Sequence, residues 1–112
     1  MQQTVSLKEN REFRRLYKKG RSYVSPVVVV YMLKNKKQYN RIGITTGKKL
    51  GKAVIRNRVK RIIREAYSGV ETQTKTGWDF VFVARNRAVN LKSWQMMKTL
   101  KGLFIQAGVW KK

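Results

Sequence analysis

Residues 48–67, KKLGKAVIRNRVKRIIREAY, combine a high density of cations with a regular apolar spacing. Every charged residue from Arg41 to Arg64 is a lysine or an arginine. Five apolar residues fall within about 100° of arc at helical periodicity, which predicts an amphipathic helix; they are Ile55, Val59, Ile62, Ile63 and Ala66. The polar side then carries Asn57, Lys60, Arg61 and Arg64, with Arg56 and Arg58 near its edges. Because like charges at i and i+4 repel, this side favours a polyanionic partner.

The charge of the whole chain supports the same partner class. The net charge is +22, and only five acidic residues oppose the cations. A phosphate backbone would relieve this self-repulsion, so nucleic acid is the expected partner. An anionic membrane surface is the alternative, but the cations are spread over several segments instead of forming one amphipathic anchor. No apolar run is long enough to span a membrane, and the N-terminus lacks a signal-peptide pattern, so a cytoplasmic location is expected.

Two further helices are predicted on either side of the central one. A capping-box pattern from Ser6 to Glu9 predicts a helix over residues 7–19, ended by Gly20 in a left-handed conformation. A last helix is expected over residues 91–107, ended by Gly108. Its predicted inner side consists of Trp94, Met97, Leu100, Leu103, Phe104 and Ala107.

Three β-branched or aromatic runs predict strands over residues 22–33, 41–46 and 78–84. The first two are expected to form a hairpin across the polar segment 34–40, and Pro26 suggests an edge or a bulge. Residues 47–51, 68–77 and 85–90 are expected to be connections, the middle one flexible. The order predicts an α+β fold in one domain, residues 1–112, with one sheet and helices packed over it.

Three residue groups are candidate functional sites. Arg56, Asn57 and Arg58 could contact phosphate, ribose or a base edge, whereas the alternative is a solvated helix face. Phe13, Tyr17 and Tyr31 could stack unpaired bases, but their periodicity alone favours core positions. The Arg-Asn-Arg tripeptide of residues 56–58 recurs at residues 85–87. Taken alone this repeat is a weak motif, and basic residues in a loop are normally just solvated.

Enzymatic chemistry by the chain itself is not expected. The chain has no histidine and no cysteine, and its five scattered acids cannot assemble an acid–base pair or a two-metal centre. The segment 47–52, GKKLGK, lacks the spacing of a phosphate-binding nucleotide loop, so nucleotide hydrolysis is not expected either.

The stretch from Lys48 to Tyr67, preceded by Gly43-Ile44, resembles the signature of the protein subunit of bacterial ribonuclease P. The resemblance extends over nearly the whole chain. It includes the first helix with Phe13 and Tyr17, the strand with Tyr31, the strand 80–85, and the last helix. This chain has Thr46-Gly47 before the two lysines where the family often has Val-Ser, and its N-terminal extension is short.

The resemblance implies an α+β two-layer sandwich with one mixed sheet of about four strands. The element order would be α-β-β-β-α-β-α, with an unusual left-handed βαβ crossover through the signature helix, and residues 22–33 could form two strands. In the family the RNA subunit is the catalyst, and it holds the metal ions that activate water at the 5′ end of mature tRNA. Mg²⁺ is therefore expected on the RNA, and no cofactor is expected on the protein.

The resemblance also assigns roles to residues. One group would face the catalytic RNA: Lys48, Lys49, Arg56, Asn57, Arg58, Arg61 and Arg64. A second group would line a cleft for the single-stranded 5′ leader of precursor tRNA: Phe13, Tyr17, Tyr31 and Lys60. For the three aromatic residues the resemblance thus favours an exposed platform over core positions. The expected partners are ribonuclease P RNA and precursor tRNA, with no membrane and no small-molecule substrate. The alternatives are a small ribosomal or RNA-chaperone protein and, less favoured, a protein-only nuclease.

Overall fold

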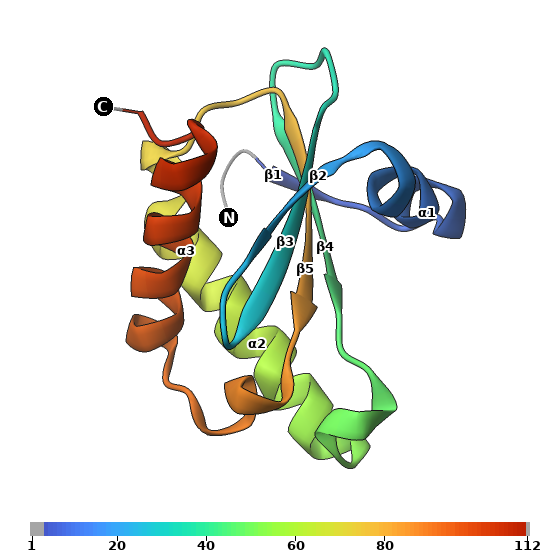
Figure 1. Ribbon diagram of the computed structural model, residues 1–112, viewed down its shortest axis with the longest axis vertical. Helices are drawn as coiled ribbons and strands as arrows, with labels where there is room; N and C mark the ends of the chain where they lie inside the picture. The colour runs from blue at the N-terminus through green and yellow to red at the C-terminus, as the bar shows by residue number, and fades with distance from the viewer. Residues whose placement is uncertain (1–3, 112) are drawn as a thin grey trace.

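The computed structural model describes residues 4–111, which form one five-stranded mixed sheet with helices on both faces (Figure 1). The strands are β1 (Thr4–Ser6), β2 (Arg21–Val24), β3 (Val28–Lys34), β4 (Asn40–Thr45) and β5 (Trp78–Ala84). The α-helices are α1 (Asn10–Lys19), α2 (Ala53–Val70) and α3 (Ser93–Ala107). Three 3₁₀ turns complete the chain: η1 (Lys48–Leu50), η2 (Glu71–Gln73) and η3 (Asn86–Asn90).

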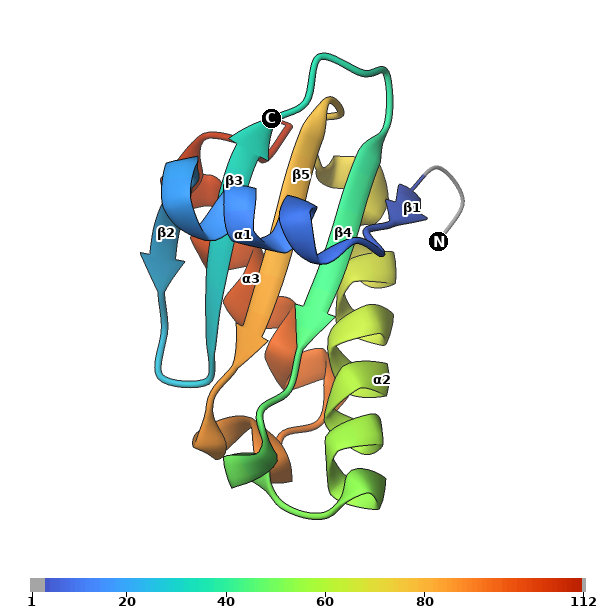
Figure 2. The same cartoon turned by 90° about the vertical axis from the view of Figure 1, so that its right-hand side faces the viewer.

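The sheet has the strand order β1-β4-β5-β3-β2, with β4 parallel to both β1 and β5. In Figure 2, β4 runs downward, the chain passes behind the sheet through α2, and β5 returns beside β4 in the same direction. This β4-α2-β5 connection is left-handed, against the general right-handed preference. The α+β fold with one mixed sheet and the element order expected from the resemblance are confirmed, with β1 as an additional short strand and α1 as a further layer on the second face of the sheet.

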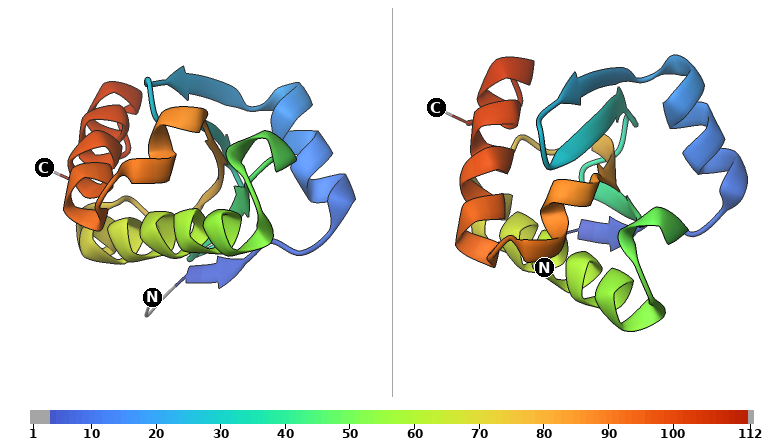
Figure 3. Two further views of the ribbon diagram at one scale, coloured as in Figure 1. Left: turned by 90° about the horizontal axis from the view of Figure 1, so that it is seen from below. Right: turned by 60° about the horizontal axis from the view of Figure 1, so that its bottom comes forward.

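Burial separates the residues of the central strands by face, as the two-residue period of a strand requires. Phe80 and Phe82 of β5 point toward α2 and α3, where they pack with Tyr67 and Phe104 in the main core. The rings of Phe80 and Phe104 stack with their centroids 5.0 Å apart. Val81 of β5 points to the opposite face, where it packs with Leu16 of α1. The sheet therefore lies between α1 on one side and the α2–α3 layer on the other (Figure 3).

Two details of the first helix differ from the sequence prediction. The helix begins at Asn10 and not at Leu7, because residues 4–6 pair with β4 and the Leu7 amide donates to the Ile42 carbonyl at 2.7 Å. The predicted capping box is therefore wrong, and Glu9 at the N-cap makes no side-chain capping bond. Gly20 has φ −75° and is extended, not left-handed. A Cβ there would lie 2.6 Å from the Leu16 carbonyl oxygen, so close approach requires the glycine.

The predicted hairpin between residues 22–33 and 41–46 is wrong in its pairing. The first run is two antiparallel strands, β2 and β3, separated by a turn that contains Pro26. β3 and β4 are not neighbours, because β5 inserts between them. β3 and β4 each pair with β5, which lies more than 30 residues further along the chain. The short loop 34–40 between β3 and β4 gives no sign of this long-range pairing.

The C-terminal half agrees with the prediction more closely. β5 has the predicted bounds, and Gly108 ends α3 with a φ of +80°. On α3, however, the prediction that Trp94 faces inward is wrong: its side chain is 58% exposed, and Met96 is buried instead. Residues 68–77, predicted to be a flexible connection, contain regular structure: α2 continues to Val70, and Thr74 forms a β-bridge with Trp110.

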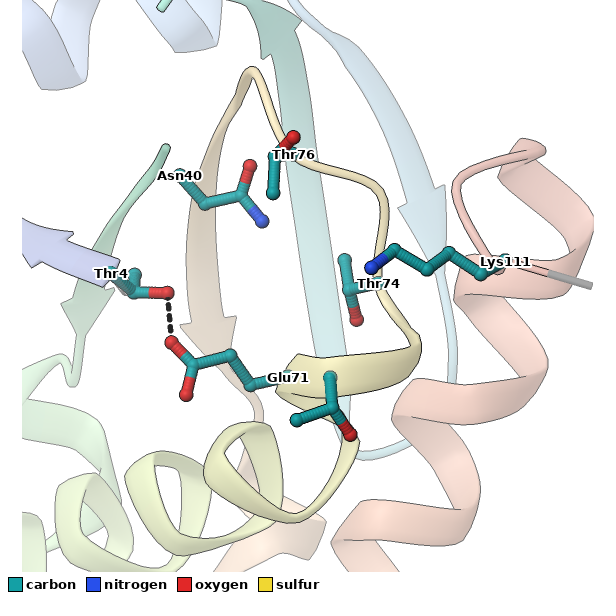
Figure 4. A pocket seen from close by; sticks show the side chains of 7 residues that line it. Thr4, Asn40, Glu71, Thr74, Thr76 and Lys111 are labelled. Atoms are coloured by element: carbon teal, nitrogen blue, oxygen red, sulfur yellow. Dashed lines mark hydrogen bonds between the residues drawn. The ribbon is translucent and has the colours of Figure 1, made fainter. Parts of the chain in front are cut away.

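A polar network attaches β1 to the end of α2. Thr4 donates to the Glu71 carboxylate, as Figure 4 shows, and its hydroxyl lies 3.0 Å from that of the buried Tyr67. Asn40 donates to the same Tyr67 hydroxyl at 3.2 Å and accepts from the Trp78 amide at 2.9 Å. Burial raises the pKa of the Tyr67 phenol, so this hydroxyl stays protonated and neutral.

An ion cluster fixes α1 on its face of the sheet. Arg41 of β4 contacts Asp79 of β5 at 2.7 Å and Glu12 of α1 at 2.6 Å. The Asp79 carboxylate, only 2% exposed, also accepts a hydrogen bond from Asn35. Hydrogen bonding to Asp79 raises the pKa of Arg41 above its ordinary value. One guanidinium thus holds together a helix and two central strands.

Replacement of Arg41 by methionine is expected to destabilise the fold by about 3–5 kcal/mol, because it leaves Asp79 buried without its cation. The measurement is the free energy of unfolding from urea denaturation. Arg11→Met is the matched control, since the Arg11–Glu9 pair is 80% and 60% exposed and contributes at most about 1 kcal/mol. Equal losses for the two variants would contradict a structural role for the cluster.

Candidate nucleic-acid interface

The central helix buries one side and leaves its cations outside. Val59, Ile62, Ile63 and Ala66 are buried as the spacing predicted, together with Tyr67 and Val70, and Ile55 is half-buried. On the other side of the helix the exposed residues include Asn57, Arg58, Arg61 and Arg64, and Lys60 is half-buried. The apolar contacts with the sheet and α3 therefore determine the direction in which this cationic face points.

The cations of α2 have few acidic partners, because the acids are engaged elsewhere. Glu9, Glu12 and Asp79 pair with Arg11 and Arg41, and Glu71 accepts from Thr4. On α2 itself, Arg61 and Glu65 approach only to 3.9 Å, and both are well exposed. Within residues 4–111, Arg58, Lys60 and Arg64 have no ion pair and no side-chain hydrogen bond. Their charges are available to a ligand.

Arg56 lies in a different environment from its neighbours on the helix. Its side chain is half-buried, and its Nε is shielded from solvent with no hydrogen-bond acceptor among the described residues. A buried donor without an acceptor is unfavourable. An anionic oxygen placed at this position would remove that cost.

The end of the molecule from which α2 starts gathers further cations. Lys48 and Lys49 in η1 are exposed, and η1 packs against both α2 and η3 (Figure 3). Arg85 and Arg87, in the second Arg-Asn-Arg tripeptide, belong to this same end and are exposed. The Arg85 guanidinium donates to the Ser25 carbonyl at 3.1 Å. We call η1, the start of α2 and residues 85–87 the basic end.

Sequence reasoning missed the contribution of residues 85–87. The motif is weak as a pattern, but β4 and β5 are parallel neighbours. The segments that follow them, η1 and η3, therefore leave the sheet at the same edge. The recurrence of Arg-Asn-Arg at residues 85–87 was the available signal. Only the strand order shows that this second tripeptide lies at the same end of the molecule as residues 56–58.

On the opposite face of the sheet, α1 and β3 form an aromatic cluster. The rings of Tyr17 and Tyr31 meet edge to face with centroids 5.0 Å apart. Tyr17 is 40% exposed, and its hydroxyl lies 3.0 Å from that of Thr45. Phe13 and Tyr31 are half-buried against Leu16 and Val81. The cluster is therefore part core and part open surface, between the two alternatives that the sequence offered.

Phe13, a member of the aromatic cluster, lies near the cations of α2 at the edge of the sheet formed by β1 and β4. Phe13 of α1, Gly43 of β4, and Lys60 and Arg64 of α2 line one cavity of about 130 Å³. Gly43 is needed for this arrangement, since a Cβ there would lie 2.4 Å from the Phe13 ring. Of the four residues assigned to a leader cleft, Phe13 and Lys60 line this cavity, and Tyr17 and Tyr31 pack on each other on the same face of the sheet as Phe13.

Residues 4–111 contain no group of three or more His, Cys, Asp or Glu side chains that could hold a metal ion. None of the described helices is both long and apolar enough to cross a membrane.

Comparison with known proteins identifies the family. The family model described as Ribonuclease P matches residues 1–108. The chain belongs to the ribonuclease P protein family. It is similar to the ribonuclease P protein component of Clostridioides difficile (strain 630), with 43% identity over 101 residues, which cover 89% of each protein. The corresponding protein of Alkaliphilus metalliredigens is 46% identical over 85 residues, or 76% of this chain and 77% of that one.

Solved structures of this family share the fold. The Staphylococcus aureus RNase P protein superposes with a TM-score of 0.84 at 36% identity, over 95% of this chain and 97% of that one. The Thermotoga maritima RNase P protein gives a TM-score of 0.82 at 30% identity, over 90% and 96%. Family membership gives the chain its general role as the protein subunit of ribonuclease P, a ribonucleoprotein of tRNA processing, and so implies an RNA partner.

The unpaired state of Arg58 yields a prediction for ribonuclease P RNA. Arg58→Ala is expected to weaken binding and to reduce the slope of log affinity against log salt by ~0.9, the value for one neutralised phosphate. Lys37→Ala, in the exposed 34–40 loop, is the control and should leave the slope unchanged. Filter binding over a salt series measures both slopes. An unchanged slope for Arg58→Ala would place this guanidinium outside the RNA contact.

Proposed function

We propose that this subunit binds the catalytic RNA through the basic end and the cationic side of α2, and holds the 5′ leader of precursor tRNA in the aromatic cleft beside α1. The observation that carries the proposal is the junction of the two surfaces: Lys60 and Arg64 of α2 line the same cavity as Phe13 of α1. A strand that leaves a folded RNA on α2 could therefore enter the cleft without crossing the protein.

The cleft suits a single strand better than a duplex. Tyr17 is open on one side and is supported by Tyr31 on the other, which is the arrangement needed to stack an unpaired base. Lys60 lies beside Phe13, one helical turn before Tyr17 on α1, and would supply a cation for a backbone phosphate there. Bases in a duplex already stack on each other and offer no free face. The 5′ leader is the single-stranded part of the substrate, whereas mature tRNA lacks it.

The side of α2 suits a folded RNA backbone. Arg56, Arg58, Arg61 and Arg64 present forked donors that match phosphate oxygens, and Asn57 can donate to and accept from a 2′-hydroxyl. Lys48 and Lys49 of η1 extend this surface around the start of the helix, and Arg85 and Arg87 add to the same basic end. A phosphate near Arg56 would also give its shielded Nε an acceptor.

The proposed mechanism is electrostatic and positional. The protein reduces the repulsion between two RNA molecules, and it favours precursor over product because only the precursor fills the cleft. Cleavage itself is assigned to the RNA subunit, with Mg²⁺ bound there. In this chain Glu12 and Asp79 both pair with Arg41, which gives these two carboxylates a structural role. The proposed place of action is the cytoplasm.

Reconstitution tests the proposal directly. At a Mg²⁺ concentration too low for the RNA alone, addition of the chain to a ribonuclease P RNA is expected to restore removal of the leader from precursor tRNA. A polylysine of similar net charge is the control for simple screening and should rescue poorly. Failure to rescue would contradict the proposed role. Cleavage by the protein without RNA would contradict the assignment of the chemistry.

The cleft makes a separate prediction. Tyr17→Ala is expected to cost ~1–3 kcal/mol in precursor binding by the holoenzyme, the range for loss of one stacked base. Tyr17→Phe is the matched control: it loses the hydroxyl contact with Thr45 but keeps the ring, and should retain most of the affinity. Equilibrium binding of precursor and mature tRNA provides the comparison. An equal loss for both RNAs would contradict leader binding in the cleft.

A further inference from the structure

A second aromatic surface lies on the α2–α3 side of the sheet, away from α1 (Figure 1). It is a groove of about 380 Å³ between the end of α2, α3 and the C-terminal segment. Gly69 and Val70 line it from α2; Trp94, Met97, Lys98 and Lys101 line it from α3; and Trp110 closes it. The groove belongs to the α2–α3 layer, and the sheet lies between this layer and α1 (Figure 2).

The groove is built by specific contacts and is not a gap between loose side chains. A Cβ at Gly69 would lie 2.4 Å from the Met97 sulfur, so the glycine allows α3 to approach α2. Trp110 is held in place by its backbone bridge to Thr74, and the neighbouring Lys111 amide donates to the Gln73 carbonyl at 2.7 Å. One wall is therefore fixed, while Trp94 on the other wall remains 58% exposed.

The charges around the groove indicate the chemistry of its occupant. Lys98 and Lys101 are its charged lining residues, and the Lys101 ammonium lies 5.4 Å from the centre of the Trp110 ring. None of the described residues that line it carries a carboxylate; the acidic residue one turn before Gly69 on α2 is Glu65, which lies beside Arg61. Aromatic rings flanked by cations fit an anionic chain with flat apolar groups, and an RNA single strand has both.

We propose that this groove is a second single-stranded RNA site, in which an unpaired base stacks on Trp94 and the adjoining phosphates contact Lys98 and Lys101. A duplex would not use the groove, because its bases are already stacked. The site is independent of the proposed leader cleft. It would let the subunit hold two separate unpaired segments on opposite faces of its sheet.

The test uses a fluorescein-labelled decauridylate and the full chain carrying Tyr17→Ala, so that the α1 cleft does not dominate binding. In that background Trp94→Ala is expected to reduce affinity about 10-fold or more, whereas Trp94→Phe retains most of it. Affinity for an abasic oligonucleotide of the same length should not change with either variant. Ile105→Ala is the matched control, an exposed apolar residue of α3 (53%) that does not line the groove.

Photocrosslinking to a 5-iodouridine decamer locates the contact and makes the result independent of the affinity change. Crosslinks to the peptides that contain Trp94 or Trp110 are expected. Unchanged decauridylate affinity in a folded Trp94→Ala variant, or crosslinks confined to other peptides, would overturn the proposal. A Trp94→Ala variant that loses self-association in sedimentation without any loss of RNA affinity would also overturn it, because the groove would then be an interface between copies of this chain.

Discussion

Burial of one side of α2 is the constraint on which the recognition surfaces depend. Val59, Ile63 and Ala66 are in contact with the main core and cannot rotate outward without loss of that packing. The same turns of helix carry Arg58, Arg61 and Arg64, so the apolar contacts hold these cations on the outside. The repulsion among them is then a standing cost of the free protein that a polyanion relieves. Folding and the proposed RNA recognition would thus use two sides of one helix.

β4 connects this helix to the aromatic cleft. Alternate residues of the strand face opposite layers: Ile42 packs in the main core toward α2, while Gly43 faces the Phe13 ring of α1. Arg41 on the α1 side also binds Glu12, which holds the helix across the sheet. The position of α1 is therefore set by the same strand that supports α2. A substrate strand and a folded RNA would meet surfaces with a fixed relative orientation.

The local sequence predicted those features that local periodicity encodes. The apolar stripe of α2, the bounds of β5 and the end of α3 at Gly108 follow from spacing and residue type. The left-handed crossover came from family resemblance alone, because general topology favours the opposite hand. Trp94 was misplaced because hydrophobicity outweighed geometry: it lies about 120° around the helix from Leu100, outside the stripe that packs on the sheet.

Other features depended on partners far away in the chain. Thr4–Ser6 becomes a strand only because β4 offers a free edge, and at Gly20 the Met32 carbonyl, together with that of Leu16, leaves no room for a Cβ. The half-exposed state of Tyr17 and the hydrogen bond from Arg85 to the Ser25 carbonyl likewise depend on the packing of distant segments. Sequence could name the residues of the candidate site, but their exposure and neighbours required the strand order.

That strand order also has a consequence for synthesis of the protein on the ribosome. The middle position of the sheet belongs to β5, which is made after β3, β4 and α2. Until residue 84 has left the exit tunnel, β3 and β4 each expose an unpaired apolar edge that faces a missing neighbour. The nascent chain cannot complete its sheet stepwise, because β5, the strand that joins the two halves of the sheet, is made last.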